Sequence, residues 1–328
     1  MKIMIAGLGS IGRRHFRNLL ALGERDILLF RSHHRTQPDD ELAGYPVATE
    51  LDAALAYRPE AVIISNPTAL HLEVALPAAK QGCHIMLEKP VAASLEGISD
   101  LQAAVSESGA RILIGYHFRH HPGLQYAKEL LAAGGIGRPL SARAHWGEYL
   151  PGWHPWEDYR QGYSARADLG GGVVLTLSHP LDYLRWLFGE VEALWAFTAK
   201  TSDLELQVED TAEISLRFAS GLLGSLHLDY NQRPGSHWLE VIGTNGTLRW
   251  DNQNGEIRVF TGDKGEWQAY PPPAGFERNH LFLAEMRHFL EVARGNAQPC
   301  CNLEDGLRAL QLALAVHASQ HQGKLIYL

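Results

Sequence analysis

"MIAGLGSIGRRH", residues 4–15, places three glycines in the spacing Gly7-x-Gly9-x-x-Gly12. The apolar run around its start predicts a strand over residues 2–6, and the apolar spacing after it predicts a helix over residues 10–22. In this setting the first glycine permits a tight turn, the second lets the backbone approach a pyrophosphate, and the third lets helix and strand pack closely. The helix N-terminus then offers N–H groups to phosphates. The predicted dinucleotide-binding residues are Gly7, Leu8, Gly9, Ser10, Ile11 and Gly12.

Strands and helices alternate from this stretch to about residue 120. Further strands are predicted over 26–30, 61–65, 84–87 and 112–115, with helices over 51–57, 71–81 and 95–108. Such alternation indicates a parallel sheet that is covered by helices on both faces. We therefore predict an α/β protein whose residues 1–120 form a Rossmann domain, a doubly wound parallel sheet that binds NAD or NADP.

The pattern changes after Pro122. Several stretches between residues 140 and 260 alternate apolar and polar residues and are separated by turn signals such as Asn245-Gly246. Consecutive strands joined by tight turns predict a mostly antiparallel sheet. Two helices are expected over 279–294 and 303–322. Residues 121–328 are assigned to a second α/β domain, and its C-terminal helices could pack back on the first.

Composition and charge narrow the class of protein. The 328 residues are 45% hydrophobic and carry a net charge of −8 without a long basic run, so nucleic acid and anionic membrane are not expected partners. The three cysteines, Cys83, Cys300 and Cys301, lack metal-binding spacing and suit a reducing compartment. Apolar runs stay short of the ~20 residues that span a bilayer. We expect a soluble cytoplasmic protein.

The end of the second predicted strand bears on the choice of cofactor. An NAD site usually has an acid there for the ribose 2′-hydroxyl, but "DILLF" runs into Arg31, Ser32 and further basic residues. Arginine and serine can bind a 2′-phosphate, which favours NADP over NAD. The alternative is a solvated basic loop on a protein that still accepts NAD.

Two later strand ends bring polar residues to the same edge of the predicted sheet. Asn66 and Pro67 follow the third strand, and His71 lies one helical turn on. The run "HIMLEKP" ends in Glu88 and Lys89 before a proline. Because ligands of open α/β sheets bind at the carboxyl ends of the strands, we expect these five residues to meet at the cofactor.

A second candidate cluster lies in "DLGGGVVLTLSHPLDYLRWLFG". His179 and Asp182 are spaced to share one face of a helix, and Thr176 should lie on the same side. Pro180 cannot donate a backbone hydrogen bond and should kink or restart the helix. The alternative interpretation is a core helix with a satisfied buried histidine.

Together these motifs resemble the Gfo/Idh/MocA family, typified by glucose–fructose oxidoreductase and inositol 2-dehydrogenase. The resemblance covers nearly the whole chain, and Glu88-Lys89-Pro90 is its most specific motif. It implies an open, mostly antiparallel sheet in the second domain that carries the substrate pocket and an interface for a homodimer or homotetramer. It also implies NAD(P)-dependent hydride transfer to or from a secondary alcohol of a sugar, a cyclitol or a sugar derivative.

The resemblance assigns catalysis to Lys89 and His179. Neutral histidine can accept the alcohol proton, and a lysine ammonium can stabilise the developing alkoxide. Many members of the family carry an aspartate three or four residues before the histidine, where this chain has Thr176 and Leu175. Asp182 could then orient His179, and Glu88 is expected to anchor the turn.

An aromatic segment after residue 144 is the expected substrate region, because aromatic faces stack on sugar C–H groups. An aromatic oligomer contact is the alternative. The histidines His117, His120 and His121 lack a nearby acid or cysteine at ligand spacing, so no metal site is predicted. The residues predicted to contact substrate, besides Lys89 and His179, are Tyr116, His117, Arg119, Glu148, Trp153, Trp156, Tyr159, Arg160, Tyr163 and Thr176.

Two other functions are compatible with the same motifs. A glycosidase could use bound NAD for transient oxidation without net cofactor reduction. A cofactor-sensing regulator could keep the fold without catalysis. Retention of both Lys89 and His179 favours an enzyme.

Overall fold

The computed structural model describes residues 1–31 and 40–328, and its contacts divide the chain into two compact units. Unit 1 comprises Met1–His117, Asp168–Gly170 and Arg278–Leu307. Unit 2 comprises Phe118–Ala167, Gly171–Glu277 and Arg308–Leu328. The sequence predicted a single boundary, between residues 1–120 and 121–328, whereas each unit consists of three separate stretches of the chain. The stretch Arg278–Leu307 belongs with the N-terminal unit because its helix packs there.

Unit 1 is built on a six-stranded parallel sheet in the order β3-β2-β1-β4-β5-β6. The chain runs outward from β1 and then returns to the other side of β1 at β4, so the strand order reverses there, as in a doubly wound fold. β1 and β4 are apolar and buried along their whole length, as expected for strands covered on both faces. The strands are β1 (Ile3–Ala6), β2 (Ile27–Phe30), β3 (Val47–Ala48), β4 (Ala61–Ile64), β5 (His84–Leu87) and β6 (Ile112–Ile114).

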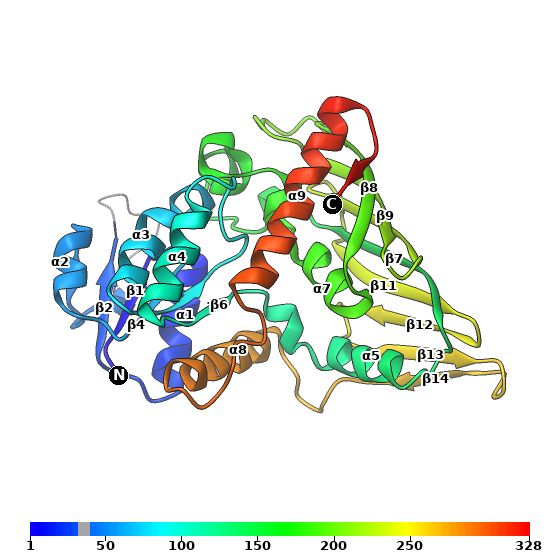
Figure 1. Cartoon of the computed structure of the whole chain (residues 1–328), viewed down its shortest axis with the longest axis horizontal. Helices are drawn as coiled ribbons and strands as arrows, with labels where there is room; N and C mark the ends of the chain where they lie inside the picture. The colour runs from blue at the N-terminus through cyan, green and yellow to red at the C-terminus, as the bar shows by residue number, and fades with distance from the viewer. Residues whose placement is uncertain (32–39) are drawn as a thin grey trace. The chain divides into compact units, whose positions relative to one another are not determined.

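The helices of unit 1 pack in pairs: α3 lies beside α4, and α1 lies beside α8 (Figure 1). Helix α4 begins three residues later than predicted because Gly97 adopts a positive φ of 75° just before it. The short strand β3 was not predicted, since two residues give no periodicity. The helices are α1 (Ser10–Ala21), α2 (Leu51–Ala56), α3 (His71–Lys80), α4 (Ile98–Ser108) and α8 (Arg278–Ala293).

Unit 2 contains a nine-stranded sheet in the order β14-β13-β12-β11-β7-β10-β9-β8-β15. All neighbouring strands are antiparallel except β7 and β10, which pair in parallel, so the predicted mostly antiparallel sheet is confirmed. The strands are β7 (Pro139–Gly147), β8 (Val191–Ala199), β9 (Thr211–Phe218), β10 (Leu223–Asp229), β11 (Ser236–Gly243), β12 (Gly246–Asp251), β13 (Ile257–Thr261), β14 (Trp267–Tyr270) and β15 (Ile326–Tyr327).

The two faces of this sheet differ in burial. Residues such as Ala144 and Leu226 point to the buried face, where α5 (Pro122–Ala132), α6 (Val173–Thr176) and α7 (His179–Phe188) pack. On the opposite face, here called the outer face, Phe197 and Leu223 are 63% and 59% exposed. The last helix, α9 (Leu303–Gln322), runs past β8 (Figure 1), where Ser319 Oγ accepts a hydrogen bond of 3.0 Å from Ala196 N.

Single-turn 3-10 helices join several of these elements. In the part of the chain that the structure describes, no helix is both long enough and apolar enough to cross a membrane. The 3-10 helices are η1 (Asp40–Leu42), η2 (Thr68–Leu70), η3 (His117–His120), η4 (Leu150–Gly152), η5 (Tyr159–Gln161), η6 (Tyr163–Ala165) and η7 (Ala167–Leu169).

Candidate active site

The glycine loop joins β1 to α1, and its three glycines have different structural requirements. Gly7 has a φ of +91°, and a Cβ there would lie 2.5 Å from the backbone N of Asn66. A Cβ at Gly12 would overlap the carbonyl oxygen of Gly7. Gly9 is exposed at the N-cap of α1, and no heavy atom lies within 4 Å of the position of its Cβ.

These differences fit a dinucleotide. Gly7 and Gly12 are required by packing, whereas Gly9 leaves space beside the helix N-terminus. No side chain of the described residues caps α1, so its first-turn N–H groups can bind a pyrophosphate. Arg31 follows β2 as predicted, with its backbone N 3.1 Å from the carbonyl oxygen of Ala48. Ser32, the other predicted contact for a 2′-phosphate, lies outside the described residues.

Asn66, His71 and the Lys89-Pro90 turn lie together, so their predicted proximity is confirmed. The ring nitrogens of buried His71 lie 3.0 Å from the carbonyl oxygens of both Pro90 and Asn66, and burial lowers the His71 pKa. Asn66 Nδ2 donates to the Leu70 carbonyl at 3.0 Å. These contacts make His71 a support of the turn. Among the described residues the buried Oδ1 of Asn66 has no hydrogen-bond partner, which leaves it available to a ligand.

Glu88 anchors the turn, as expected. Its Oε1 lies 2.7 Å from Nε2 of His15, a residue of α1, and its Oε2 accepts from the backbone N of Lys89 at 3.3 Å. Burial opposes ionisation of Glu88, but the hydrogen bond and charge of His15, together with Lys89, hold its pKa below the usual value. His15 was not predicted, since 73 residues separate it from Glu88.

Lys89 is half-buried at the start of the cis Lys89-Pro90 bond. Loss of hydration lowers the pKa of its ammonium to about 8, although the Glu88 carboxylate raises it. Arg278, from the stretch that joins unit 1 late in the sequence, lowers it further. The ammonium is therefore poised to titrate within one or two units of neutral pH.

A second buried carboxyl, Glu285 on α8, also belongs to unit 1. Its side chain is 1% exposed, and neither carboxyl oxygen has a hydrogen-bond partner among the described residues. Burial and the negative charge of Glu88 raise its pKa well above the usual value, which favours the neutral carboxyl. The sequence signal was one acid in the apolar run "LFLAEMRHFL", and Glu285 was not predicted as a site residue.

Two further predicted contacts of unit 1, Tyr116 and His117, are buried. Tyr116 is 1% exposed and His117 is 6% exposed. The His117 ring packs on Phe282 with their centroids 4.3 Å apart. Much of both side chains is therefore packed inside the unit, and a direct substrate contact stays a prediction.

In unit 2 the helix around His179 is interrupted as Pro180 predicted. Helix α6 ends at Thr176, and α7 starts at His179 with Pro180 in its first turn, where a missing N–H costs nothing. Thr176 is therefore not on the same helix as His179, contrary to the shared face expected from their spacing. His179 is 2% exposed and meets Phe118 edge to face, with centroids 5.1 Å apart.

Arg119 and Asp182 bind each other. The guanidinium Nη2 lies 2.6 Å from Asp182 Oδ1, and its Nε lies 3.0 Å from Oδ2. Their side chains are only 3% and 2% exposed. Arg119 was predicted to contact substrate and Asp182 to take part in catalysis. Each side chain carries a charge, and burying either charge without the other would be costly. Their contacts therefore describe a structural ion pair, and the catalytic role of Asp182 stays a prediction.

The predicted substrate segment is anchored mainly to unit 2 itself. Glu148 accepts from Trp146 Nε1 at 2.9 Å, Trp153 packs edge-on against Tyr230, and the Tyr159 hydroxyl accepts from the backbone N of Glu205 at 3.1 Å. Arg160 forms exposed ion pairs with Asp158 and Glu205. Tyr163 is half-buried, while Trp156 is 64% exposed and is the side chain most accessible to a ligand or a second subunit.

Comparison with known proteins decides the family. A family profile described as "Oxidoreductase family, NAD-binding Rossmann fold" matches residues 1–116, and one described as "GFO/IDH/MocA C-terminal domain" matches residues 124–249. A 1,5-anhydro-D-fructose reductase of Ensifer adhaerens is 30% identical over 264 residues, 78% of this chain and 76% of the relative. The chain belongs to the Gfo/Idh/MocA family. It is an oxidoreductase whose first 116 residues form an NAD-binding Rossmann domain.

Other members of the Gfo/Idh/MocA family extend the match over the full length. A myo-inositol 2-dehydrogenase of Thermotoga maritima is 26% identical over 100% of this chain and 98% of the relative. The solved structure of a levoglucosan dehydrogenase in complex with NADH and L-sorbose superposes with a TM-score of 0.86 at 20% identity, covering 100% of this chain and 98% of that one. That structural match confirms the predicted α/β fold.

Proposed function

We propose that this protein is a dehydrogenase or reductase that transfers hydride between nicotinamide and a secondary alcohol of a sugar, a cyclitol or a sugar derivative. The observation that carries the proposal is Lys89, a half-buried ammonium with a pKa of about 8. It stands on a turn fixed by Glu88, His15 and His71, in the unit that carries the glycine loop. A lysine whose pKa burial brings toward neutral, in the unit that carries the glycine loop, is a candidate functional group.

The proposed chemistry gives Lys89 and His179 separate roles. When bound, nicotinamide supplies the group that accepts or donates hydride. Lys89 stabilises the negative charge that develops on the alcohol oxygen, and at pH 7 a group of this pKa is about 90% protonated. His179 accepts the hydroxyl proton in the oxidative direction and returns it in the reductive direction. The His179 side chain is buried edge to face with the Phe118 ring.

Substitution of each residue tests this division. Lys89→Ala and His179→Ala should each lower turnover by 10²-fold or more, the usual contribution of a positioned acid–base group. Binding of reduced nicotinamide cofactor, followed by its fluorescence, should remain. Trp156→Ala serves as a control that should change KM for substrate more than turnover. Wild-type turnover in either of the first two variants would contradict the proposal.

Sugar-type substrates are proposed from two observations. The relatives are named for anhydrofructose, myo-inositol and levoglucosan, which are all polyhydroxylated rings. In this chain Trp156 offers an exposed aromatic face, which suits the C–H face of such a ring. A panel of sugars, cyclitols and nucleotide sugars, assayed by absorbance of the reduced cofactor, would identify the class. Release of free sugar without cofactor reduction would indicate instead the glycosidase alternative.

We also propose a preference for NADP over NAD. It is supported by the lack of an acid at the end of β2, where Arg31 stands instead. The solved relative above holds NADH, so the preference has to come from residues of this chain. Dissociation constants for both reduced cofactors test it, and Arg31→Ala should weaken NADPH binding selectively. Tighter binding of NADH by tenfold would contradict the preference.

We propose further that the protein is a cytoplasmic homodimer or homotetramer that associates through the unit 2 sheet. Exposed Phe197 and Leu223 on its outer face support this interface, since association would remove both side chains from water. The cytoplasmic location is supported by three cysteines that form no disulfide with one another. Light scattering after size exclusion should give an oligomer, and Phe197→Glu with Leu223→Lys should dissociate it.

A further inference from the structure

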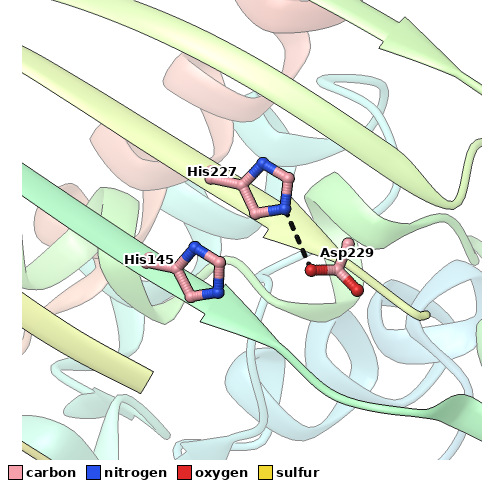
Figure 2. A group of neighbouring side chains, drawn as sticks. All are labelled: His145, His227 and Asp229. Carbon is pink, nitrogen blue, oxygen red and sulfur yellow. Dashed lines mark hydrogen bonds and ion pairs between the residues drawn. The ribbon is translucent and has the colours of Figure 1, made fainter. Parts of the chain in front are cut away.

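Three potential metal ligands, His145, His227 and Asp229, lie close together on the outer face of the unit 2 sheet (Figure 2). One ligand atom from each lies within 4.8 Å of the other two. His145 stands on β7, and the other two stand on β10. The parallel pairing of these strands places His227 directly opposite His145 and Asp229 opposite Gly147.

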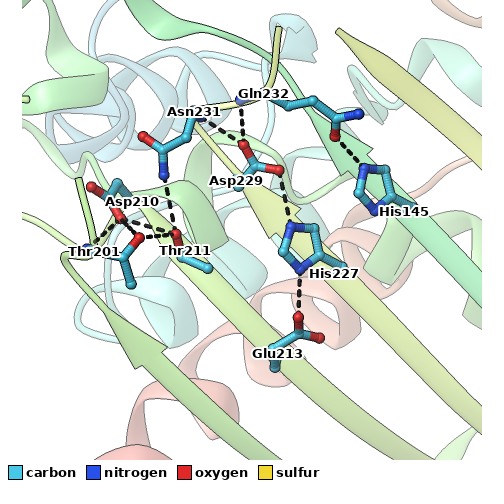
Figure 3. Close-up of polar contacts among 9 residues, drawn as sticks. All are labelled: His145, Thr201, Asp210, Thr211, Glu213, His227, Asp229, Asn231 and Gln232. Carbon is cyan, nitrogen blue, oxygen red and sulfur yellow. Dashed lines mark hydrogen bonds and ion pairs between the residues drawn. The ribbon is translucent and has the colours of Figure 1, made fainter. Parts of the chain in front are cut away.

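The orientation of His227 is fixed by two carboxylates, one at each ring nitrogen (Figure 3). Its Nδ1 lies 2.6 Å from Oε1 of Glu213 on β9, and its Nε2 lies 2.9 Å from Oδ2 of Asp229. Both contacts favour the charged ring, and the His227 pKa is raised, first through Asp229 and then through Glu213. The two carboxylates therefore hold the ring with Nε2 toward Asp229 and Nδ1 toward Glu213.

Asp229 presents a single oxygen to this cluster. Its Oδ1 accepts hydrogen bonds from the backbone N–H groups of Asn231 and Gln232, at 2.6 and 2.7 Å. The loop that supplies them is itself held, because Asn231 Nδ2 donates to Thr211 Oγ1 at 3.2 Å (Figure 3). Oδ2 is left facing His227.

Gly147 provides the space that the cluster needs. A Cβ at this position would overlap Asp229 Oδ2 and the side-chain oxygen of Gln232. Its backbone is not in the left-handed region, so the turn does not require a glycine here. The missing side chain instead lets the Asp229 carboxylate and the Gln232 side chain lie against the backbone of β7, next to the contact that Gln232 makes with His145 Nε2.

We propose that His145, His227 and Asp229 form a binding site for a divalent transition-metal ion, with Zn²⁺ as the representative ion. Two imidazole nitrogens and one carboxylate oxygen are a usual ligand set for such ions, and a water or the Gln232 side-chain oxygen completes it. Glu213 then serves as the outer carboxylate that orients a metal-bound histidine through its other nitrogen.

Binding requires one local movement and one proton release. Ligand atoms of a tetrahedral zinc site are about 3.3 Å apart, so the three donors have to close in slightly. The His145 ring, stacked on His227 at 4.7 Å between centroids, turns about its Cβ–Cγ bond and leaves Gln232. Histidine ligates a metal as neutral imidazole, so any proton on a ligating nitrogen passes to solvent when the ion binds.

Titration of the full-length protein with Zn²⁺ tests the proposal. Chelator-treated protein is titrated by calorimetry in a buffer that does not bind metal ions. We expect one ion per chain. Co²⁺ in the same site should give the visible absorption of a four- or five-coordinate ion.

Variants separate this site from the other histidines. His227→Ala and Asp229→Asn should abolish Zn²⁺ binding, and Glu213→Gln should weaken it by about 10–100-fold. His145→Phe removes a ligand but keeps an aromatic ring stacked beside Trp238. A loss of binding in this variant would therefore not be due to misfolding. His321→Ala, an exposed histidine on α9, is the matched control and should bind like the parent. Parent-like affinity in His227→Ala or His145→Phe, or no binding by the parent protein, would overturn the proposal.

Discussion

The buried pair of Arg119 and Asp182 allows a quantitative test of what holds unit 2 together. Asp182→Asn keeps the size of the side chain and removes the charge that faces Arg119 at 2.6 and 3.0 Å. Both side chains are almost fully buried, so the variant takes a negative charge away from a buried guanidinium. Such a loss costs about 3–5 kcal/mol in the free energy of unfolding.

The expected shift can be measured specifically in unit 2. All eight tryptophans lie in that unit, so tryptophan fluorescence in urea follows its unfolding alone. With an m-value of about 3 kcal/mol/M, a loss of about 4 kcal/mol lowers the midpoint by about 1.3 M. Arg119→Met combined with Asp182→Leu removes both charges and should recover most of the loss, because an apolar pair of similar size is often as stable.

An exposed pair on the same unit provides the control. Glu240 and Arg249 are 2.6 Å apart, but the arginine side chain is 54% exposed. Glu240→Gln should therefore cost at most about 1 kcal/mol. A cost for Asp182→Asn no larger than this control, or a double variant as unstable as the sum of its parts, would refute the reasoning. Turnover of Asp182→Asn at a temperature where it is fully folded also tests the catalytic role.

Three further predictions concern unit 1. Glu88→Gln removes the carboxylate that raises the Lys89 pKa, so the alkaline limb of the pH profile of kcat/KM should move from about pH 8 to lower pH by about one unit. An unchanged limb would argue against the role of Lys89. The raised pKa of Glu285 means that the folded state favours its neutral form, so its contribution to stability is complete below the usual glutamate pKa and is lost as pH rises through the raised value. Glu285→Gln should therefore gain in melting temperature relative to the parent protein as pH rises above the usual glutamate pKa, measured by circular dichroism, and a constant difference would contradict this. Gly9→Ala should fold normally but bind reduced cofactor at least tenfold more weakly, whereas Gly7→Ala should lower the melting temperature, because Gly7 has a positive φ and its Cβ would collide with a backbone atom. Equal stability of the two variants would be inconsistent with the loop geometry.

Local patterns predicted most of the elements of both units. The glycine loop between β1 and α1 and the helix restart at His179 follow from residues close in sequence, where backbone sterics and hydrogen bonding decide the outcome. The strands β3 and β14 were missed because they are short, and pairing with a neighbouring strand is what defines them.

Partnerships between distant charges could not be predicted in the same way. Glu88 and Asp182 were both recognised as acids near the proposed chemistry, but their partners, His15 and Arg119, are 73 and 63 residues away. A buried charge requires a partner, but the sequence around it does not show which residue provides that partner. The His145, His227 and Asp229 cluster was missed for a related reason. The sequence predicted antiparallel neighbours, whereas the cluster forms across the one parallel pair of the sheet, β7 and β10.

The assembly of unit 1 from separated stretches has a consequence for synthesis. The edge strand β6 is bonded through Ile114 N to the carbonyl oxygen of Cys301 at 2.9 Å, and Arg111 Nη1 donates to the carbonyl oxygen of Val292 at 3.0 Å. A nascent chain that has emerged only to His117 lacks both partners and the helix that packs on α1. The ribosome must therefore produce nearly all of unit 2 before unit 1 can close, so the two units mature together, and early fragments present an open sheet edge to chaperones.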